Sequence, residues 1–293
     1  MKNTALVITI LATLIGTASV SFGDTKTCAQ NLTVKSGLSK LPALKSYYVV
    51  SEFKGPVGHL DNDQRQPLDR IKNPEYNGIG AIDTKLGRGS AWLGNECLVW
   101  TAKHVLGRNQ KVLGQKVTFN VGQSQTPGKD FEYSIEGEVV ASGNPDANRA
   151  DNGAEDWALI KLKKSFNDKL EKGISQRIPK ITTAQYSVED AQTCKTLEVA
   201  GYPGEKSVKN LWWQGNCSLD TSMSGLTAFN VSCPVTPGNS GGPLLCREAD
   251  GSLRAIGVMN QQVASATRGL AVNFTADWAN AKAAYQKYKD TCN

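Results

Sequence analysis

The sequence has very few of the side chains that usually bind metal ions. Its 293 residues include only two histidines, His59 and His104, and no C-x-x-C pair of cysteines. Zinc sites are commonly built from several His and Cys ligands at short spacings. We therefore expect no zinc site of the common types in this chain.

The chain also lacks any apolar stretch of the roughly 18 residues that a membrane-spanning helix needs. Its first residues have the pattern of a signal peptide, with Lys2, the short apolar segment Ala5–Ile15, and small residues at Ser21 and Gly23. We expect residues 1–23 to be removed. An N-terminal anchor is the alternative, and the short apolar segment argues against it. The mature protein is then exported and soluble, in a periplasm or outside the cell.

Positive charge is present but nowhere concentrated. The formal net charge is +6, and losing Lys2 with the signal peptide lowers it by one, without a basic stripe along the chain. Proteins that bind nucleic acid usually gather Lys and Arg on one face. We therefore expect no nucleic-acid partner and interpret the charge as an aid to solubility.

The cysteines indicate an oxidising compartment. Exported proteins often form disulfide bonds, whereas cytosolic proteins rarely do. Because the number of cysteines is odd, we expect disulfides and one remaining thiol. All seven lie beyond the signal peptide: Cys28, Cys97, Cys194, Cys217, Cys233, Cys246 and Cys292.

Residues 24–75 and 76–293 differ in composition. The first segment is polar and irregular, which is typical of a pro-segment or of an N-terminal extension that packs along the body. The second favours an all-β fold, because many short β-rich runs are separated by Gly, Pro, Asn and Asp. A helix is expected over Ala276–Lys289, which is rich in Ala and Lys and follows a candidate N-cap, Thr275. The expected strands are Gly78–Ile82, Ser90–Leu93, Leu98–Ala102, Lys116–Val121, Glu136–Ala141, Trp157–Leu162, Thr196–Ala200, Asn210–Gln214, Leu226–Ser232, Pro243–Cys246, Leu253–Met259 and Leu270–Phe274.

A glycine-flanked serine is the first of three motifs that carry chemistry. It lies in the run Gly238–Pro243, which reads G-N-S-G-G-P. A serine hydroxyl is a weak nucleophile and needs both a neighbouring base and a site that stabilises an oxyanion. A sharp glycine-rich turn would expose Ser240 and let the N–H groups of Gly238 and Ser240 converge as an oxyanion hole. The alternative is an ordinary Gly/Ser-rich turn.

A histidine and an aspartate supply the other two motifs. His104 follows the apolar run Leu98–Val99, and Asp156 stands directly before the apolar strand Trp157–Leu162. Each has a structural alternative, a packed histidine or a turn aspartate. However, burying an unpaired carboxylate is costly, and an imidazole N–H would pair it. We predict that His104 is a general base, that Asp156 orients it, and that Ser240 is the nucleophile.

In the order His104, Asp156, Ser240, these motifs resemble the chymotrypsin-like (trypsin-fold) serine proteases, since other serine hydrolases have other orders. The resemblance covers roughly residues 78–290. It implies two perpendicular six-stranded β-barrels with a C-terminal helix. It also implies a secreted, monomeric serine endopeptidase that hydrolyses protein or peptide substrates through an acyl-enzyme and needs no metal or organic cofactor. The alternatives are a catalytically silent binding protein with this fold and an esterase with the same triad.

Within that class, the G-N-S-G-G-P motif and the segment Asp61–Arg65 resemble the bacterial glutamyl endopeptidase-like branch. Trypsins have Asp before the nucleophile, where it receives the N-terminal amine freed on activation, and this chain has Asn239 there. We therefore do not expect activation through that ion pair, although Arg70-Ile71 resembles a cleavage junction. Whether residues 24–75 are removed, or inhibit the enzyme as in a zymogen, stays open.

The resemblance also locates a substrate pocket. A trypsin-like pocket has an acid about six residues before the nucleophile, where this chain has Pro234, so weak cleavage after Lys or Arg is expected. Glutamyl endopeptidases have a histidine on the strand after the nucleophile, and Ile256–Gln262 contains none, which puts Glu specificity in doubt. The expected pocket residues are Pro234, Met259, Asn260, Gln261, Gly269 and Ala271.

Disulfide pairs follow from the same resemblance. It implies a Cys194–Cys246 bond, and a Cys217–Cys233 bond across an expected hairpin. Of the three cysteines that are left, we expect Cys28 to pair with Cys292, which would retain the N-terminal extension after a cut. The partner of Cys97 stays open.

Overall fold

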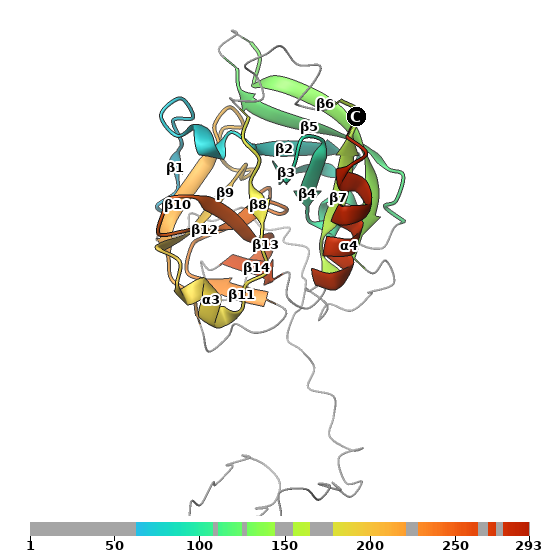
Figure 1. Ribbon diagram of the computed structural model, residues 1–293. Helices are drawn as coiled ribbons and strands as arrows, with labels where there is room; N and C mark the ends of the chain where they lie inside the picture. The colour runs from blue at the N-terminus through green and yellow to red at the C-terminus, as the bar shows by residue number, and fades with distance from the viewer. Residues whose placement is uncertain are drawn as a thin grey trace, which may run out of the picture. The chain divides into compact units, whose positions relative to one another are not determined.

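The computed structural model describes residues 63–107, 111–124, 128–143, 155–164, 178–220, 228–262, 269–273 and 278–292, all within one compact unit, Ser46–Asn293. The expected signal peptide and residues 24–62 lie outside the described residues. The elements (Figure 1) are β1 (Gln66–Pro67), η2 (Pro74–Tyr76), β2 (Ile79–Thr84), β3 (Gly87–Leu93), β4 (Leu98–Thr101), α1 (Lys103–Leu106), β5 (Lys116–Gln123), β6 (Phe131–Ser142), β7 (Ala158–Leu162), β8 (Thr182–Thr183), α3 (Val188–Gln192), β9 (Thr196–Gly201), β10 (Trp212–Cys217), β11 (Ala228–Val231), β12 (Pro243–Arg247), β13 (Leu253–Gln262), β14 (Gly269–Asn273) and α4 (Trp278–Lys289).

The first half of the described chain forms a closed barrel with the strand order β2-β3-β4-β7-β6-β5. Successive side chains of a strand point to opposite faces. In β6, Ile135 and Val139 are accordingly buried, while Glu136 and Glu138 between them are exposed. Phe119 lies in the interior with its strand partners Ile82 and Ile135. Trp92 and Trp100 are buried on the outer face of the barrel wall, where Trp100 stacks on the C-terminal helix.

The second half forms an eight-stranded sheet in which six strands make a second barrel. The ladder runs β10-β9-β12-β13-β14-β11, with β1 added beside β10 and β8 beside β13. Just after β10, an antiparallel bridge between Leu219 and Val231 closes the circle onto β11. The core contains Val199, Phe229 and Leu244. The predicted architecture of two six-stranded barrels and a C-terminal helix is therefore confirmed.

All twelve expected strands are present, with bounds shifted by a few residues. The sequence did not predict β1 and β8, because two-residue strands show no alternation, nor the short helices α1 and α3. The described part of the C-terminal helix begins at Trp278 and ends at Lys289. No helix among the described residues is long and apolar enough to cross a membrane.

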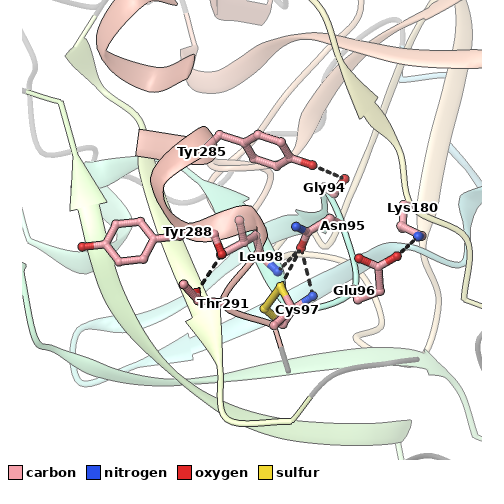
Figure 2. The surroundings of a disulfide bond; sticks show 10 residues. Gly94, Asn95, Glu96, Cys97, Leu98, Lys180, Tyr285, Tyr288 and Thr291 are labelled. Carbon is pink, nitrogen blue, oxygen red and sulfur yellow. Dashed lines mark hydrogen bonds and ion pairs between the residues drawn. A yellow bond between two sulfur atoms is a disulfide. The ribbon is translucent and has the colours of Figure 1, made fainter. Parts of the chain in front are cut away.

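The C-terminal helix packs on the first barrel. It contacts β4 and β7, as Figure 1 shows, and the ring of Tyr285 stacks on Trp100 with their centroids 6.2 Å apart. This places Cys292 beside Cys97, and the two form a disulfide (Figure 2). The side chain of Asn95 holds the turn that presents Cys97, because its Oδ1 accepts the backbone N–H of Cys97 at 3.0 Å.

The Cys97–Cys292 bond corrects the expected Cys28–Cys292 bond. The partner of Cys292 is decided by where the C-terminal helix docks, and the helix docks beside the start of β4. Cys28 itself lies outside the described residues. The other two disulfides, Cys194–Cys246 and Cys217–Cys233, join the cysteines that the resemblance paired.

Removing the Cys97–Cys292 bond by a double serine substitution is expected to lower the free energy of unfolding by about 5 kcal/mol on the chain-entropy argument, because the bond closes a long loop. The partners are 195 residues apart, whereas Cys217 and Cys233 are 16 apart. The equivalent double substitution of that shorter loop should cost about 2 kcal/mol less on the chain-entropy argument. Urea unfolding measures both. A peptide joining Cys28 to Cys292 in a non-reducing digest would contradict the assignment.

Candidate active site

Strand pairing brings the predicted histidine and aspartate together. β4 and β7 are antiparallel neighbours in which Thr101 lies opposite Ala158. His104 follows Thr101 by three residues, in α1, and Asp156 precedes Ala158 by two. Residues just beyond paired strand ends lie at the same edge of a sheet. The two side chains therefore meet at one end of the first barrel, as their positions in the motifs predicted.

The contact between them has two points. The Oδ2 atom of Asp156 lies 2.7 Å from Nδ1 of His104, and its Oδ1 accepts the backbone N–H of His104 at 2.9 Å. Both side chains are about 19% exposed, so the pair is largely shielded from solvent. An imidazole that donates Nδ1–H to a carboxylate keeps the lone pair of Nε2 as an acceptor. Within the described residues, Nε2 has no hydrogen-bond partner.

The serine motif is anchored to the first barrel by Ser90 of β3. The backbone N–H of Ser90 donates to the carbonyl of Ser240 at 2.8 Å, and its hydroxyl donates to the carbonyl of Gly238 at 2.7 Å. Ser90 is fully buried. A residue of the first barrel thus fixes two backbone carbonyls of a turn that belongs to the second.

Gly241 places this turn against the histidine segment. Its φ is +85°, and a Cβ there would lie 2.2 Å from Oγ1 of Thr101 and 2.3 Å from the carbonyl oxygen of Ser90. Only glycine allows so close an approach. Because Thr101 is three residues before His104, the contact brings the turn that carries Ser240 against the segment that carries His104.

Two N–H groups of the turn are directed outward. In a trans peptide the N–H points opposite to the preceding C=O. The carbonyl of Pro237 is held by the N–H of Gly204 at 2.7 Å, and the carbonyl of Asn239 accepts an N–H from further along the turn at 2.9 Å. The N–H groups of Gly238 and Ser240 therefore point away from these bonds, and neither has an acceptor in the described part of the chain. Both N–H groups are therefore available to an external acceptor, as an oxyanion site requires.

The expected pocket residues lie on strands that flank the turn. Met259 exchanges backbone hydrogen bonds with it, accepting the N–H of Gly241 at 2.6 Å and donating to the carbonyl of Gly242 at 2.8 Å. Ala271 is the strand partner of Met259, and Gly269 is the partner of Gln262, next to Gln261. Asn260 and Pro234 are buried, Pro234 in the loop that leads to the turn.

Two residues that contact this turn were not identified from the sequence. Ser90 gives no signal beyond starting a β-rich run. Arg65 ends the segment Asp61–Arg65, which resembles glutamyl endopeptidases, and its guanidinium donates to the side chain of Asn239 at 3.2 Å. In both cases the contact spans well over a hundred residues, so no local pattern indicates it.

Comparison with known proteins agrees with this fold. The chain resembles the structure titled "Structure of Glu endopeptidase in complex with MPD" with a TM-score of 0.54 at 16% identity, over 75% of this chain and 95% of that one. It also resembles the thermostable serine protease AL20 from an extremophilic microorganism, with a TM-score of 0.53 at 19% identity, over 75% of this chain and 100% of that one. The comparison with curated proteins gives no match.

The sequence itself matches a family. Residues 82–282 match the family described as Trypsin, a span that includes His104, Asp156 and Ser240 together with all but the first few residues of the two barrels. The matched span exceeds half of the 293 residues. The chain therefore belongs to the trypsin family and is a serine endopeptidase.

Proposed function

We propose that the protein is an exported endopeptidase in which Ser240 is the nucleophile, His104 the general base and Asp156 the residue that orients the base. The observation that carries the proposal is the junction of two barrels. One barrel holds the His104–Asp156 pair at 2.7 Å, and the other presents a serine turn with two outward N–H groups beside it.

The proposed reaction has two steps. Ser240 Oγ attacks the peptide carbonyl carbon as His104 Nε2 takes the hydroxyl proton, and the carbonyl oxygen becomes an oxyanion bound by the N–H groups of Gly238 and Ser240. The imidazolium, stabilised by Asp156, then protonates the leaving amine. Water then attacks the acyl carbon as His104 takes its proton. The bond from Ser240 Oγ to the acyl carbon breaks as His104 passes that proton to Oγ, which releases the new carboxyl terminus and restores the serine.

Hydrogen bonding supports the roles of the individual groups. Asp156 accepts from both the ring and the backbone N–H of His104, so the ring cannot turn away from the pair without losing a bond. Apo enzymes often have long or poorly aligned catalytic hydrogen bonds that tighten with substrate. In the described part of this chain, Ser240 Oγ and His104 Nε2 are not yet hydrogen-bonded.

A fluorophosphonate probe tests the nucleophile. We expect a single adduct per chain, on the peptide that contains Ser240, and none in a Ser240→Ala variant. The intact mass of the same sample reports where the mature chain begins, which export through the signal pattern places at Asp24. Casein and a short acyl ester, compared as substrates, separate an endopeptidase from an esterase.

Two outcomes would contradict the proposal. An absence of labelling, even after the N-terminal segment has been trimmed, would favour a binding protein that keeps the fold. Turnover of the ester with no cleavage of casein would favour an esterase. The substrate class proposed is protein or peptide, with weak cleavage after Lys or Arg.

A further inference from the structure

A buried arginine lies behind the nucleophile turn. The side chain of Arg65 is 1% exposed although it belongs to the polar N-terminal segment. Its Nε and Nη2 donate to the two carboxylate oxygens of Asp63 at 2.8 and 3.0 Å, and Nη2 also donates to Oε1 of Glu205 at 2.5 Å. The two carboxylates thus orient the guanidinium from one side.

The remaining nitrogen of the guanidinium faces the turn. Nη1 of Arg65 donates to Oγ1 of Thr236 at 2.9 Å and to Oδ1 of Asn239 at 3.2 Å. These two residues are also joined to each other, because the N–H of Asn239 donates to the carbonyl of Thr236 at 3.0 Å. The hydroxyl of Thr236 donates in turn to Glu205 at 2.7 Å. Arg65 therefore clamps both ends of one turn.

The charges in this cluster are balanced. Arg65 and Lys206 face Asp63 and Glu205, and Lys206 Nζ lies 2.9 Å from Asp63. Burial alone would raise the pKa of Asp63, but hydrogen bonds from Arg65 and Lys206 hold that pKa well below its usual range. Burial would likewise lower the pKa of Arg65, and Asp63 and Glu205 raise it instead. Separating the buried Arg65 from its partners would leave its charge uncompensated, which is strongly unfavourable, so the pairs keep the guanidinium in place.

The two N–H groups proposed to bind the oxyanion lie in the clamped turn and directly after it. Gly238 lies between Thr236 and Asn239, and Ser240 follows directly. The loop that carries Glu205 also supplies the N–H of Gly204 that fixes the carbonyl of Pro237, and so the direction of the Gly238 N–H. If Arg65 moved, both the turn at Asn239 and the loop at Glu205 would lose a hydrogen-bond donor.

We propose that Arg65 is a positioning residue that holds the Thr236–Asn239 turn, and with it the N–H groups of Gly238 and Ser240, in the geometry needed for catalysis. The inference rests on the proposed function of the turn. If Arg65 has this role, the turn forms without a cut between Arg70 and Ile71. Residues from Asp63 onward then stay part of the active enzyme.

The first test compares Arg65→Ala with Arg254→Ala in the full-length protein. Arg254 pairs with Glu248 on the surface of the same sheet, at 3.0 Å, and serves as the matched control. We expect Arg65→Ala to slow fluorophosphonate labelling of Ser240 by about tenfold or more, since losing one oxyanion donor alone costs about 10²–10³ in rate. Hydrogen exchange should rise in the peptide 234–244 and stay unchanged in β4 and β7, and Arg254→Ala should match the wild type.

A second pair of variants keeps Arg65 in place. Asn239→Asp preserves the acceptor and adds a charge that favours the guanidinium, so we expect labelling close to the wild-type rate. Asn239→Leu removes the acceptor and is expected to label as slowly as Arg65→Ala. If the contact between Arg65 and Asn239 served stability alone, Asn239→Leu would lower the melting temperature but would label as fast as Asn239→Asp. This pair decides the question if Arg65→Ala does not fold.

The outcomes separate the two proposals. If the wild type labels at Ser240 and Arg65→Ala labels equally fast with unchanged exchange, the positioning role is wrong and the proposed function stands. If the wild type does not label even after the segment before Asp63 has been trimmed, the proposed function fails. Exchange in the peptide 234–244 then still reports whether Arg65 holds the turn.

Discussion

Replacing Asp156 with asparagine is expected to lower kcat for peptide hydrolysis by about 10⁴-fold, the size of the effect for the same change in another serine protease triad. An amide cannot stabilise the imidazolium that forms when Ser240 loses its proton. It can also donate to Nδ1 of His104, which would leave the ring with its proton on Nε2, where the acceptor is needed. The fold should survive, since asparagine has nearly the same shape.

The matched control is Asp83→Asn in the first barrel. Asp83 accepts hydrogen bonds from Arg88 at 2.6 Å and from Asn120 at 2.7 Å, so it is also a paired carboxylate. Its substitution should leave kcat within about twofold of the wild type. Its charge belongs to a partly exposed ion pair, and such pairs contribute little to the free energy of unfolding. Steady-state kinetics and thermal unfolding of both variants measure the effect. An Asp156→Asn enzyme with more than a tenth of the wild-type kcat would remove Asp156 from the triad.

The strands could be predicted from the sequence because each is a short apolar run with clear ends. Short apolar runs bounded by Gly, Pro, Asn and Asp predict strands wherever the run exceeds about three residues. They do not say which strands pair. The meeting of His104 and Asp156 depends on the register of β4 against β7, with Thr101 opposite Ala158, and this register follows from no local pattern. The resemblance to a family, carried by three motifs in a fixed order, supplied that information.

The features that the sequence could not predict all depend on distant contacts. Cys292 pairs with Cys97 because the C-terminal helix docks beside β4, and cysteine spacing alone is compatible with several pairings. Arg65 lies in a polar segment, where an arginine is normally solvated. Its burial follows from Glu205 and Asn239, which are 140 and 174 residues away along the chain.

Three of the distant contacts, other than the disulfide, share a location, the turn that carries Ser240. Ser90 holds it from the first barrel, Met259 from the second, and Arg65 from the N-terminal segment. A glycine-rich turn is intrinsically permissive, so its conformation has to be set by its surroundings. The motif therefore predicts the chemistry, while the three anchors determine the geometry in which the chemistry can occur.

The glycine after the nucleophile is the most sensitive of these positions. Gly241→Ala is expected to lower the free energy of unfolding by about 3–5 kcal/mol, the sum of left-handed backbone strain and overpacking. The new Cβ would lie 2.2 Å from Oγ1 of Thr101 and 2.3 Å from the carbonyl oxygen of Ser90. The latter is backbone of a packed strand and cannot move aside. Any relief would shift Ser240 away from His104, so fluorophosphonate labelling should fall by about 10²-fold or more as the oxyanion donors are displaced.

Gly251→Ala provides the matched control. Its φ of +86° is nearly the same as the +85° of Gly241, but nothing lies within 4 Å of a Cβ at this position. The control measures only the cost of a left-handed backbone conformation, about 1–2 kcal/mol in the free energy of unfolding. It should leave the labelling rate unchanged. Urea unfolding and the labelling rate of both variants separate strain from contact. If both substitutions lowered the free energy of unfolding and the labelling rate equally, the turn would not be in contact with the first barrel. The proposed placement of Ser240 beside His104 would then be wrong.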